Sequence, residues 1–258
     1  MKTRVISGVA IFLICVLPIV FGGIPLKVLL AAILLIADYE LINVRYHKPV
    51  IHLYVFNAVA IAFMALSDHG VMIGLLSLLL LFFMAVIDLN ITVEDVALYF
   101  TTNTLIGFAL KGILYTYELT GNWFNFVYIL LAVCLCDIFA LLGGSRFGKH
   151  KLAPTISKNK TIEGSVCGWL FGAVLSFVYA LTVSKVLGIT INVGAYLFIS
   201  VTITILAQVG DLAFSMIKRH FDTKDFGNLI PGHGGVLDRI DSIIFGCIYF
   251  FVIMSFIL

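Results

Sequence analysis

Five polar residues in the C-terminal half of the chain have the spacing of a single helix face. Steps of four, three, four and three residues separate Thr204, Gln208, Asp211, Ser215 and Lys218. An α-helix makes one turn in about 3.6 residues, so these side chains should form one polar stripe on an otherwise apolar helix. An ionised group near the end of an apolar span is costly unless it faces a cavity, which predicts a functional role for Asp211 and Lys218. For Thr204 and Gln208, a hydrogen-bonded contact between helices is the alternative.

Two more carboxylates, Asp238 and Asp241, stand three residues apart at the start of the last apolar run. At the start of a helix both would face the same way. Together with Asp211 they offer oxygen ligands of the kind that suit Mg²⁺. The segment 211–242 holds five Asp residues and four Lys or Arg residues. This near balance suits a divalent cation bound together with phosphate groups better than simple anchoring to lipid.

A second charged segment, residues 143–164, is strongly basic. Five bases precede its only acid, Glu163, and they are Arg146, Lys149, Lys151, Lys158 and Lys160. Two interpretations stay open: the bases anchor the chain against anionic lipid headgroups, or they bind a polyphosphate. In the second case Gly143, Gly144 and Gly148 would let backbone N–H groups approach the phosphate oxygens.

The sequence Pro-Gly-His-Gly-Gly at 231–235 lies between the polar stripe and the last apolar run. Proline and three glycines disfavour a regular helix, and a glycine turn can aim backbone N–H groups at an anion. His233 would then donate a hydrogen bond to a phosphate or to a leaving group. The alternative is a loop histidine that faces the lipid headgroups.

The elements that position these residues are predicted to be membrane helices. Of the 258 residues, 62% are hydrophobic and 12% are charged, against roughly 45–50% and 25% in soluble domains. This excess of apolar side chains excludes a soluble globular enzyme, a disordered chain and a nucleic-acid binder. The apolar runs are continuous, which favours helices over the short alternating strands of a β-barrel. Nine runs of this kind cover about residues 5–22, 24–43, 50–67, 70–89, 94–114, 123–142, 163–187, 190–212 and 240–258.

The predicted architecture is an all-α polytopic membrane protein with about nine transmembrane helices. It forms a single transmembrane domain over residues 1–258, with the motifs in residues 137–242. The first run opens with two basic residues, as a signal peptide does, but it has no clean cleavage site and is expected to be retained. The five cysteines lie in or beside apolar runs without metal-site spacing, and we interpret them as buried apolar residues.

Lys and Arg residues are distributed unevenly between the two ends of these spans. Thirteen of the 16 fall on one side, and they are Lys2, Arg4, Arg45, Lys48, Arg146, Lys149, Lys151, Lys158, Lys160, Lys218, Arg219, Lys224 and Arg239. Only Lys27, Lys111 and Lys185 fall on the other side. The positive-inside rule therefore predicts a cytoplasmic N-terminus in the inner or plasma membrane, with both charged segments on the cytoplasmic face.

The residues of the two charged segments match a known pattern. The longer match reads Ser215-x-x-Lys218-Arg219-x4-Lys224-Asp225, followed by Pro231-x-His233-Gly234-Gly235-x-x-Asp238-Arg239-x-Asp241. It resembles the signature of the CDP-diacylglycerol synthases, also called phosphatidate cytidylyltransferases. Upstream, Ser157-Lys158-Asn159-Lys160-Thr161-x-Glu163-Gly164 is similar to the "SPKKTxEG" block of that family, and Asp137 with residues 146–149 fits its lead-in. Three positions depart from the pattern: Lys158 replaces the usual proline, Asn159 replaces a frequent base, and Phe214 replaces a frequent glutamate.

The resemblance implies a reaction. The phosphate of phosphatidic acid attacks the α-phosphorus of CTP, CDP-diacylglycerol forms, and pyrophosphate leaves. Such a transfer requires alignment and charge stabilisation more than covalent chemistry by the protein, so Ser215 as a covalent nucleophile is the weaker interpretation.

The resemblance and the charge pattern together assign roles to individual residues. The expected catalytic residues are Asp211, Asp238, Lys218, Ser215 and His233. Those expected to bind substrate phosphates are Arg146, Lys158, Lys160, Arg219, Lys224 and Arg239. Mg²⁺ is the expected cofactor, held by Asp211, Asp238 and Asp241, and a second metal ion or K⁺ is compatible with this site. Phosphatidic acid, CTP and membrane lipids are the expected partners, a homodimer is allowed, and no nucleic acid is expected.

Three other hypotheses are weighed against this one. An enzyme that joins a CDP-activated lipid to an alcohol would carry a DG-x2-AR-x8-G-x3-D-x3-D pattern, which the sequence lacks. A secondary transporter would show inverted repeats and charges near the middle of broken helices, whereas these charges gather at one face and no repeat is visible. A relative of the same family that has lost activity is the third alternative, because of Phe214.

Overall fold

The computed structural model describes residues 2–47, 50–232 and 234–257. Within these residues the chain forms nine helices and one short hairpin. The helices are α1 (Lys2–Phe21), α2 (Gly23–Tyr46), α3 (Ile51–Leu66), α4 (Gly70–Ile87), α5 (Val93–Thr120), α6 (Phe124–Phe147), α7 (Ile162–Leu187), α8 (Val193–His220) and α9 (Leu237–Ile257). The antiparallel hairpin consists of β1 (Lys151–Ala153) and β2 (Ser157–Thr161).

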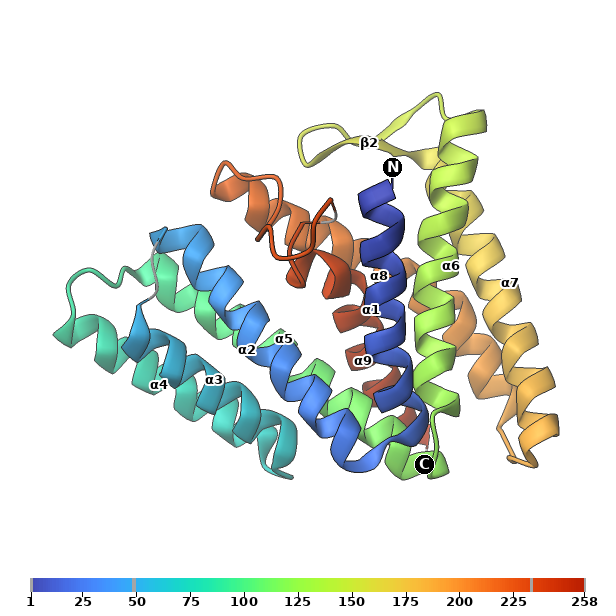
Figure 1. Ribbon diagram of the computed structural model, residues 1–258, viewed down its shortest axis with the longest axis horizontal. Coiled ribbons are helices and arrows are strands. Elements are labelled where there is room, and N and C mark those ends of the chain that lie inside the picture. The colour runs from blue at the N-terminus through green and yellow to red at the C-terminus, as the bar shows by residue number, and fades with distance from the viewer. Residues whose placement is uncertain (1, 48–49, 233, 258) are drawn as a thin grey trace.

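Each of the nine predicted apolar runs coincides with one helix, and consecutive helices run in alternate directions (Figure 1). Among the described residues, six helices are long and apolar enough to cross a membrane: α4, α5, α6, α7, α8 and α9. The apolar helix α3 is shorter, with 16 residues. The protein is thus an integral membrane protein with a mainly helical fold. The beginning of α1, the hairpin and the segment between α8 and α9 lie at one end of the bundle, and the C-terminus lies at the other (Figure 1).

Local sequence signals explain where several helices begin. Thr92 and Asp95 form a capping box, in which each side chain accepts from the backbone N–H of the other residue. The Thr161 hydroxyl accepts from Gly164 N at the start of α7, and Asn192 accepts from Ala195 N at the start of α8. These bonds satisfy N–H groups that would otherwise lack a partner at a helix end.

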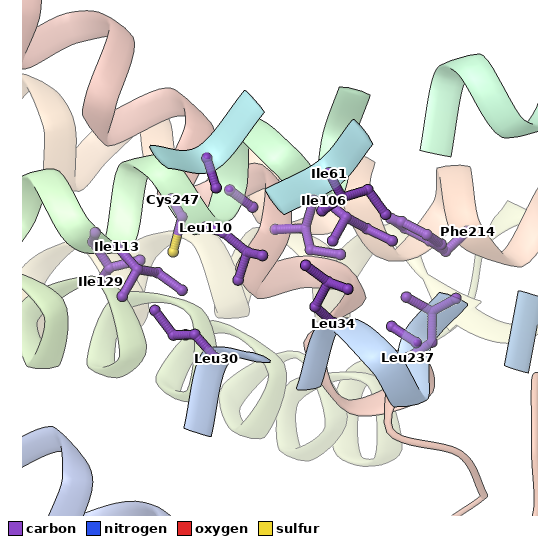
Figure 2. Close-up of a cluster of buried hydrophobic side chains, with 14 of the residues drawn as sticks. Leu30, Leu34, Ile61, Ile106, Leu110, Ile113, Ile129, Phe214, Leu237 and Cys247 are labelled. Atoms are coloured by element: carbon purple, nitrogen blue, oxygen red, sulfur yellow. The ribbon is translucent and has the colours of Figure 1, made fainter. Parts of the chain in front are cut away.

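Buried apolar side chains of the eight helices α2 to α9 form the core of the bundle. Figure 2 shows Leu30 and Leu34 of α2 close to the α5 side chains Ile106 and Leu110, with Leu237 of α9 nearby. The α9 helix lies in the middle of this arrangement and packs on α5, α6 and α8. The beginning of α9, which carries the motif carboxylates, is therefore fixed by surrounding helices.

The α6 and α7 helices approach each other closely because small residues face one another. Gly164, Gly168 and Gly172 recur every four residues on α7. A Cβ atom at Gly168 would lie 2.5 Å from the carbonyl oxygen of Cys136 on α6, and one at Gly164 would lie 2.5 Å from that of Ala140. Close packing of this kind is typical of small residues at four-residue spacing in membrane helices. It holds the hairpin, which connects these two helices, against the end of the bundle.

The structure differs from the sequence prediction at the ends of several helices. The α6 helix continues to Phe147 and α8 continues to His220, beyond the predicted span ends at 142 and 212. All five residues of the polar stripe consequently lie on one helix. The basic segment also contains the β1–β2 hairpin, where we predicted only a loop.

Candidate active site

The two charged segments meet at the end of the bundle. Lys160, at the end of β2, forms an ion pair with Asp211 on α8. The hydroxyl of Ser215, one turn further along α8, lies 3.4 Å from Oδ1 of Asp211. These contacts join the upstream basic block to the polar stripe, which are separated by about fifty residues in the sequence.

Lys218 connects the polar stripe to the start of α9. Its Nζ lies 2.8 Å from Oδ1 of Asp238 and 3.9 Å from Oδ2 of Asp241. Lys218 is only 7% exposed, so its charge is largely removed from water and depends on these carboxylates for compensation. The three residues form a compact charged group from both motif helices.

Asp238 also orders the loop between α8 and α9. Its second oxygen, Oδ2, accepts from the backbone N–H groups of Phe226 at 2.8 Å and Gly235 at 3.0 Å. A bridge between Ile230 and Gly234 closes the turn that contains the proline and glycines. Gly234 has φ +86°, a backbone conformation that side-chain-bearing residues rarely adopt. The turn is thus held by the same carboxylate that binds Lys218.

Glu40 is a site residue that the sequence analysis did not identify. It lies on α2, is 3% exposed, and accepts from the backbone N–H groups of Val236 and Leu237 at the start of α9, both at 2.9 Å. Cβ atoms at Gly227 or Gly235 would come within 2.6 Å of its carboxylate. A negative charge at a helix N-terminus is favourable, so Glu40 stabilises the first turn of α9. No local signal indicated this contact, because Glu40 and Leu237 are 197 residues apart.

A cavity of about 440 Å³ opens between the hairpin, α6 and α8. Its polar lining includes Asp137, Lys160, Gln208 and Asp211, together with backbone near Gly144. Asp137 and Asp211 line this cavity from α6 and α8, and Lys160, which also lines it, pairs with Asp211. Asp137, which the sequence analysis placed only in a motif lead-in, is therefore part of the charged site.

Carboxylate oxygens are the ligands that a hard divalent cation prefers. Among the residues that the structure describes, no three His, Cys, Asp or Glu side chains converge closely enough to enclose a metal ion. Instead, the ammonium groups of Lys160 and Lys218 lie against Asp211, Asp238 and Asp241. In this arrangement the lysine ammonium groups compensate the charges of the carboxylates.

The remaining predicted phosphate-binding residues are distributed around this centre. Arg219 ties the end of α8 to the hairpin, since its guanidinium donates to the carbonyl oxygens of Ile156 and Thr223. Lys224 and Arg239 line a neighbouring polar cavity of about 590 Å³. Arg146 and Lys158 are exposed and form no ion pair with another described residue. His233 and Lys48 lie outside the described residues.

Two stripe residues and Phe214 have packing roles. Gln208 bonds with the Ser165 hydroxyl and donates to the Ser165 carbonyl oxygen, which joins α8 to α7. The Thr204 hydroxyl donates to carbonyl oxygens of its own helix. Phe214 is fully buried between the rings of Phe226 and Phe245, at centroid distances of 5.9 and 6.5 Å. It therefore packs in the core beside the site, within one helical turn of both Asp211 and Lys218 on α8.

Comparison with known proteins identifies the class to which this site belongs. The sequence model of the cytidylyltransferase family matches residues 2–257. A phosphatidate cytidylyltransferase of Staphylococcus aureus (strain COL) is 36% identical over 256 residues, which cover 95% of each chain. Relatives with the same name from Staphylococcus haemolyticus and Staphylococcus epidermidis are 32% and 33% identical over 255 and 256 residues, again with 95% of each chain covered.

The chain belongs to the cytidylyltransferase family, and the resemblance found in its motifs is confirmed. It is a membrane-integral nucleotidyltransferase. The match extends over the N-terminal helices as well, for which the sequence analysis noted only a similarity in hydropathy. This membership also sets aside the transporter hypothesis and the hypothesis of an enzyme that uses CDP-activated lipid.

Proposed function

We propose that this protein is a phosphatidate cytidylyltransferase that depends on Mg²⁺. The phosphate oxygen of phosphatidic acid attacks the α-phosphorus of CTP, the bond between that phosphorus and the bridging oxygen breaks, and pyrophosphate leaves with its electron pair. One observation carries the proposal: Lys160, Asp211, Lys218, Asp238 and Asp241 meet at the end of the bundle in a chain of this family. The full-length similarity to relatives with this name adds support.

Each charged residue has a role in this proposal. Asp211, Asp238 and Asp241 hold the metal, with Asp137 completing the negative surface. A bound Mg²⁺ would supply positive charge beside the reacting phosphates. Lys160, Lys218 and Arg219 bind phosphate oxygens at the centre, and Arg146 and Lys158 attract CTP from the surface. His233 keeps its proposed role as a hydrogen-bond donor. Ser215, which the sequence analysis expected to be catalytic, is instead proposed to position Asp211.

The phosphate nucleophile is already ionised near neutral pH, so the site needs no strong general base. Its main tasks are to bring two anions together and to stabilise charge as pyrophosphate leaves. Buried cations such as Lys218 are suited to this, because an ion pair is stronger where water is excluded. We further propose that this end of the bundle faces the cytoplasm in the inner or plasma membrane, where CTP is available.

The test is turnover by the purified protein in detergent micelles. Phosphatidic acid, CTP labelled in the α-phosphate and Mg²⁺ are supplied, and label is followed into the lipid phase. We expect label transfer with equimolar release of pyrophosphate, and no transfer when phosphatidic acid or Mg²⁺ is omitted. If folded protein transfers no label when both phosphatidic acid and CTP are saturating, the proposed function is overturned. The protein would then be a family member without this activity.

A further inference from the structure

A cavity larger than the one at the hairpin lies on the opposite side of the charged site. It has a volume of about 720 Å³ and opens between the last turns of α2 and the segment 221–229 that follows α8. Small-molecule sites usually have volumes of roughly 300–1,000 Å³. Its lining is mainly apolar and includes Leu35, Ile36 and Val44 on α2 and Leu229 in the opposite wall.

The end of α2 and the segment after α8, which form the walls of this cavity, lie at the end of the bundle where the loops gather (Figure 1). Arg45 holds the end of α2 against α5, with its Nε 2.5 Å from Oδ1 of Asp95. Glu40 holds α2 against the start of α9. Leu35 and Leu229 are exposed beside the opening, and Tyr39 and Tyr54 also line it. Tyrosines of this kind are typical of the depth at which lipid headgroups meet the hydrocarbon.

The apolar cavity adjoins the polar cavity that contains Lys224 and Arg239. Asp225 and Asn228 line both cavities, so only the segment 225–229 separates them. Lys224 and Arg239 form no ion pair with a described carboxylate. Arg239 directly follows Asp238 in the first turn of α9, beside the carboxylates of the charged site. A phosphate bound by Arg239 would therefore lie next to the carboxylate centre.

This pairing of cavities suits a lipid phosphate better than a nucleotide. The apolar walls of the larger cavity offer few hydrogen-bond partners to a triphosphate. The hairpin cavity has no comparable apolar wall from α2 and carries more polar side chains, among them Asn159, Lys160 and Gln208. The difference in lining thus favours the lipid beside α2 and the nucleotide beside the hairpin.

We propose that the cavity between α2 and the segment 221–229 binds the glycerol and upper acyl portion of phosphatidic acid, with the lipid phosphate held between Lys224 and Arg239. CTP then binds on the hairpin side, and the two substrates meet at Asp211, Asp238 and Asp241 from opposite directions. This inference rests on the proposed function and adds the location and orientation of the lipid.

The first test fills the cavity. Ile36→Trp and Leu229→Trp place a large side chain on opposite walls of it. We expect the KM for long-chain phosphatidic acid to rise by roughly tenfold or more, since a bound apolar group would be excluded, while the KM for CTP stays unchanged. The matched control is Val178→Trp on the exposed face of α7, which lines none of the cavities described above. Folded variants with a wild-type KM for the lipid, or with a raised KM for CTP instead, would overturn the inference.

The second test does not depend on turnover or on the folding of a variant. Wild-type protein is photolabelled with phosphatidic acid that carries a diazirine near the start of its acyl chain. We expect label in peptides covering 35–54 and 221–229, displaced by unlabelled phosphatidic acid but not by diacylglycerol, which lacks the phosphate. Label confined to α6 and α7, or equal displacement by diacylglycerol, would overturn the inference. Absence of turnover with correctly placed label would instead count against the proposed function alone.

Discussion

Each of the two central lysines lies against carboxylates from a different part of the chain. Lys160 pairs with Asp211, and Lys218 lies between Asp238 and Asp241. In the proposed reaction these ammonium groups meet phosphates, and the carboxylates are released to hold Mg²⁺. Competition between phosphate and carboxylate for the same lysines would couple substrate binding to metal binding.

Asp211 is the residue at which this coupling is most easily tested. Asp211→Asn keeps the size of the side chain but removes the charge that pairs with Lys160 and that we propose binds the metal. We expect turnover to fall by about a hundredfold or more, as for the loss of other charge-stabilising groups, with no loss of folded protein. Steady-state label transfer and thermal unfolding in detergent measure the two effects. Asp222→Asn is the control, because Asp222 is exposed and its left-handed backbone conformation also accommodates asparagine.

Phe214 stands where the family resemblance led us to expect a glutamate, and its surroundings are apolar. It is fully buried against Phe226 and Phe245. Phe214→Glu should therefore lower the free energy of unfolding by about 3–5 kcal/mol, from the lost aromatic packing and the buried charge. Thermal unfolding of this variant measures the cost. Phe214→Leu, which keeps an apolar side chain at this position, is the control. A fully stable Phe214→Glu protein with increased turnover would contradict it.

The helices act on the site through their packing against one another. The α2 helix supplies Glu40 to the start of α9 and one wall of the large cavity. The α6 and α7 helices position the hairpin. The α8 helix carries Asp211, which contacts the hairpin, and Lys218, which contacts the start of α9. The N-terminal helices thus have a direct part in forming the site, although none of the recognised motifs lies in them.

Glu40→Gln tests the contact between α2 and α9. The amide keeps one acceptor but presents an N–H group to a backbone N–H, so one buried hydrogen bond is lost together with the charge at the helix start. We expect the free energy of unfolding to fall by about 1–3 kcal/mol, and turnover to fall as well because Asp238 and Asp241 lie on the first two turns of α9. Glu118→Gln is the control, since Glu118 is exposed at the other end of the bundle. Equal stability and turnover in both variants would rule out this role for Glu40.

Gly168→Ala tests the close approach of α6 and α7. The added Cβ would lie 2.5 Å from the carbonyl oxygen of Cys136, so the helices must separate. We expect a loss of about 1–3 kcal/mol in unfolding free energy, accompanied by a higher KM for CTP because the hairpin shifts. Gly194→Ala on α8 is the matched control, since its nearest neighbour would lie at an ordinary 3.5 Å. An unchanged unfolding temperature in Gly168→Ala would show that this interface can relax.

Across the whole molecule, the chemistry is confined to one end of a helical bundle. The hairpin and the α8–α9 segment lie at that end, while the C-terminus lies at the other (Figure 1). A membrane enzyme that joins a lipid to a soluble nucleotide needs this arrangement, because lipid phosphates lie at headgroup depth. The excess of Lys and Arg at the same end also attracts both anionic substrates.

The two ends of α7 provide a test of the proposed orientation. Lys158 lies in the hairpin that precedes α7, and Lys185 lies in the last turn of α7. Each is replaced by cysteine in a separate variant, Lys158→Cys and Lys185→Cys. We expect a membrane-impermeant maleimide to reach position 185 in sealed cells and position 158 only in inverted vesicles, with wild-type protein as the background control. Labelling of position 158 from outside sealed cells would invert the topology and would place the site away from cytoplasmic CTP.

The helices of this protein and the chemical groups that they carry can be predicted from local patterns in its sequence. All nine helices were predicted from continuous apolar runs, and the polar stripe from Thr204 to Lys218 was predicted from helical periodicity alone. These features depend on residues that are near in sequence, and the low polarity of the membrane makes hydrophobicity an unusually direct guide to them. The motif spacing was specific enough to indicate the family, which the full-length comparison confirmed.

Only the tertiary structure decided which distant groups share a site. The contact from Glu40 to Leu237 and the pairing of Lys160 with Asp211 join separate segments, and no periodicity predicts such contacts. The inward position of Phe214 and the apolar cavity beside α2 depend likewise on how the helices pack. Sequence determined the helices and the chemical groups they carry because these depend on neighbours along the chain. The packing of the helices determined which of those groups lie in contact and where the cavities proposed for the two substrates lie. Both depend on residues that are neighbours in space.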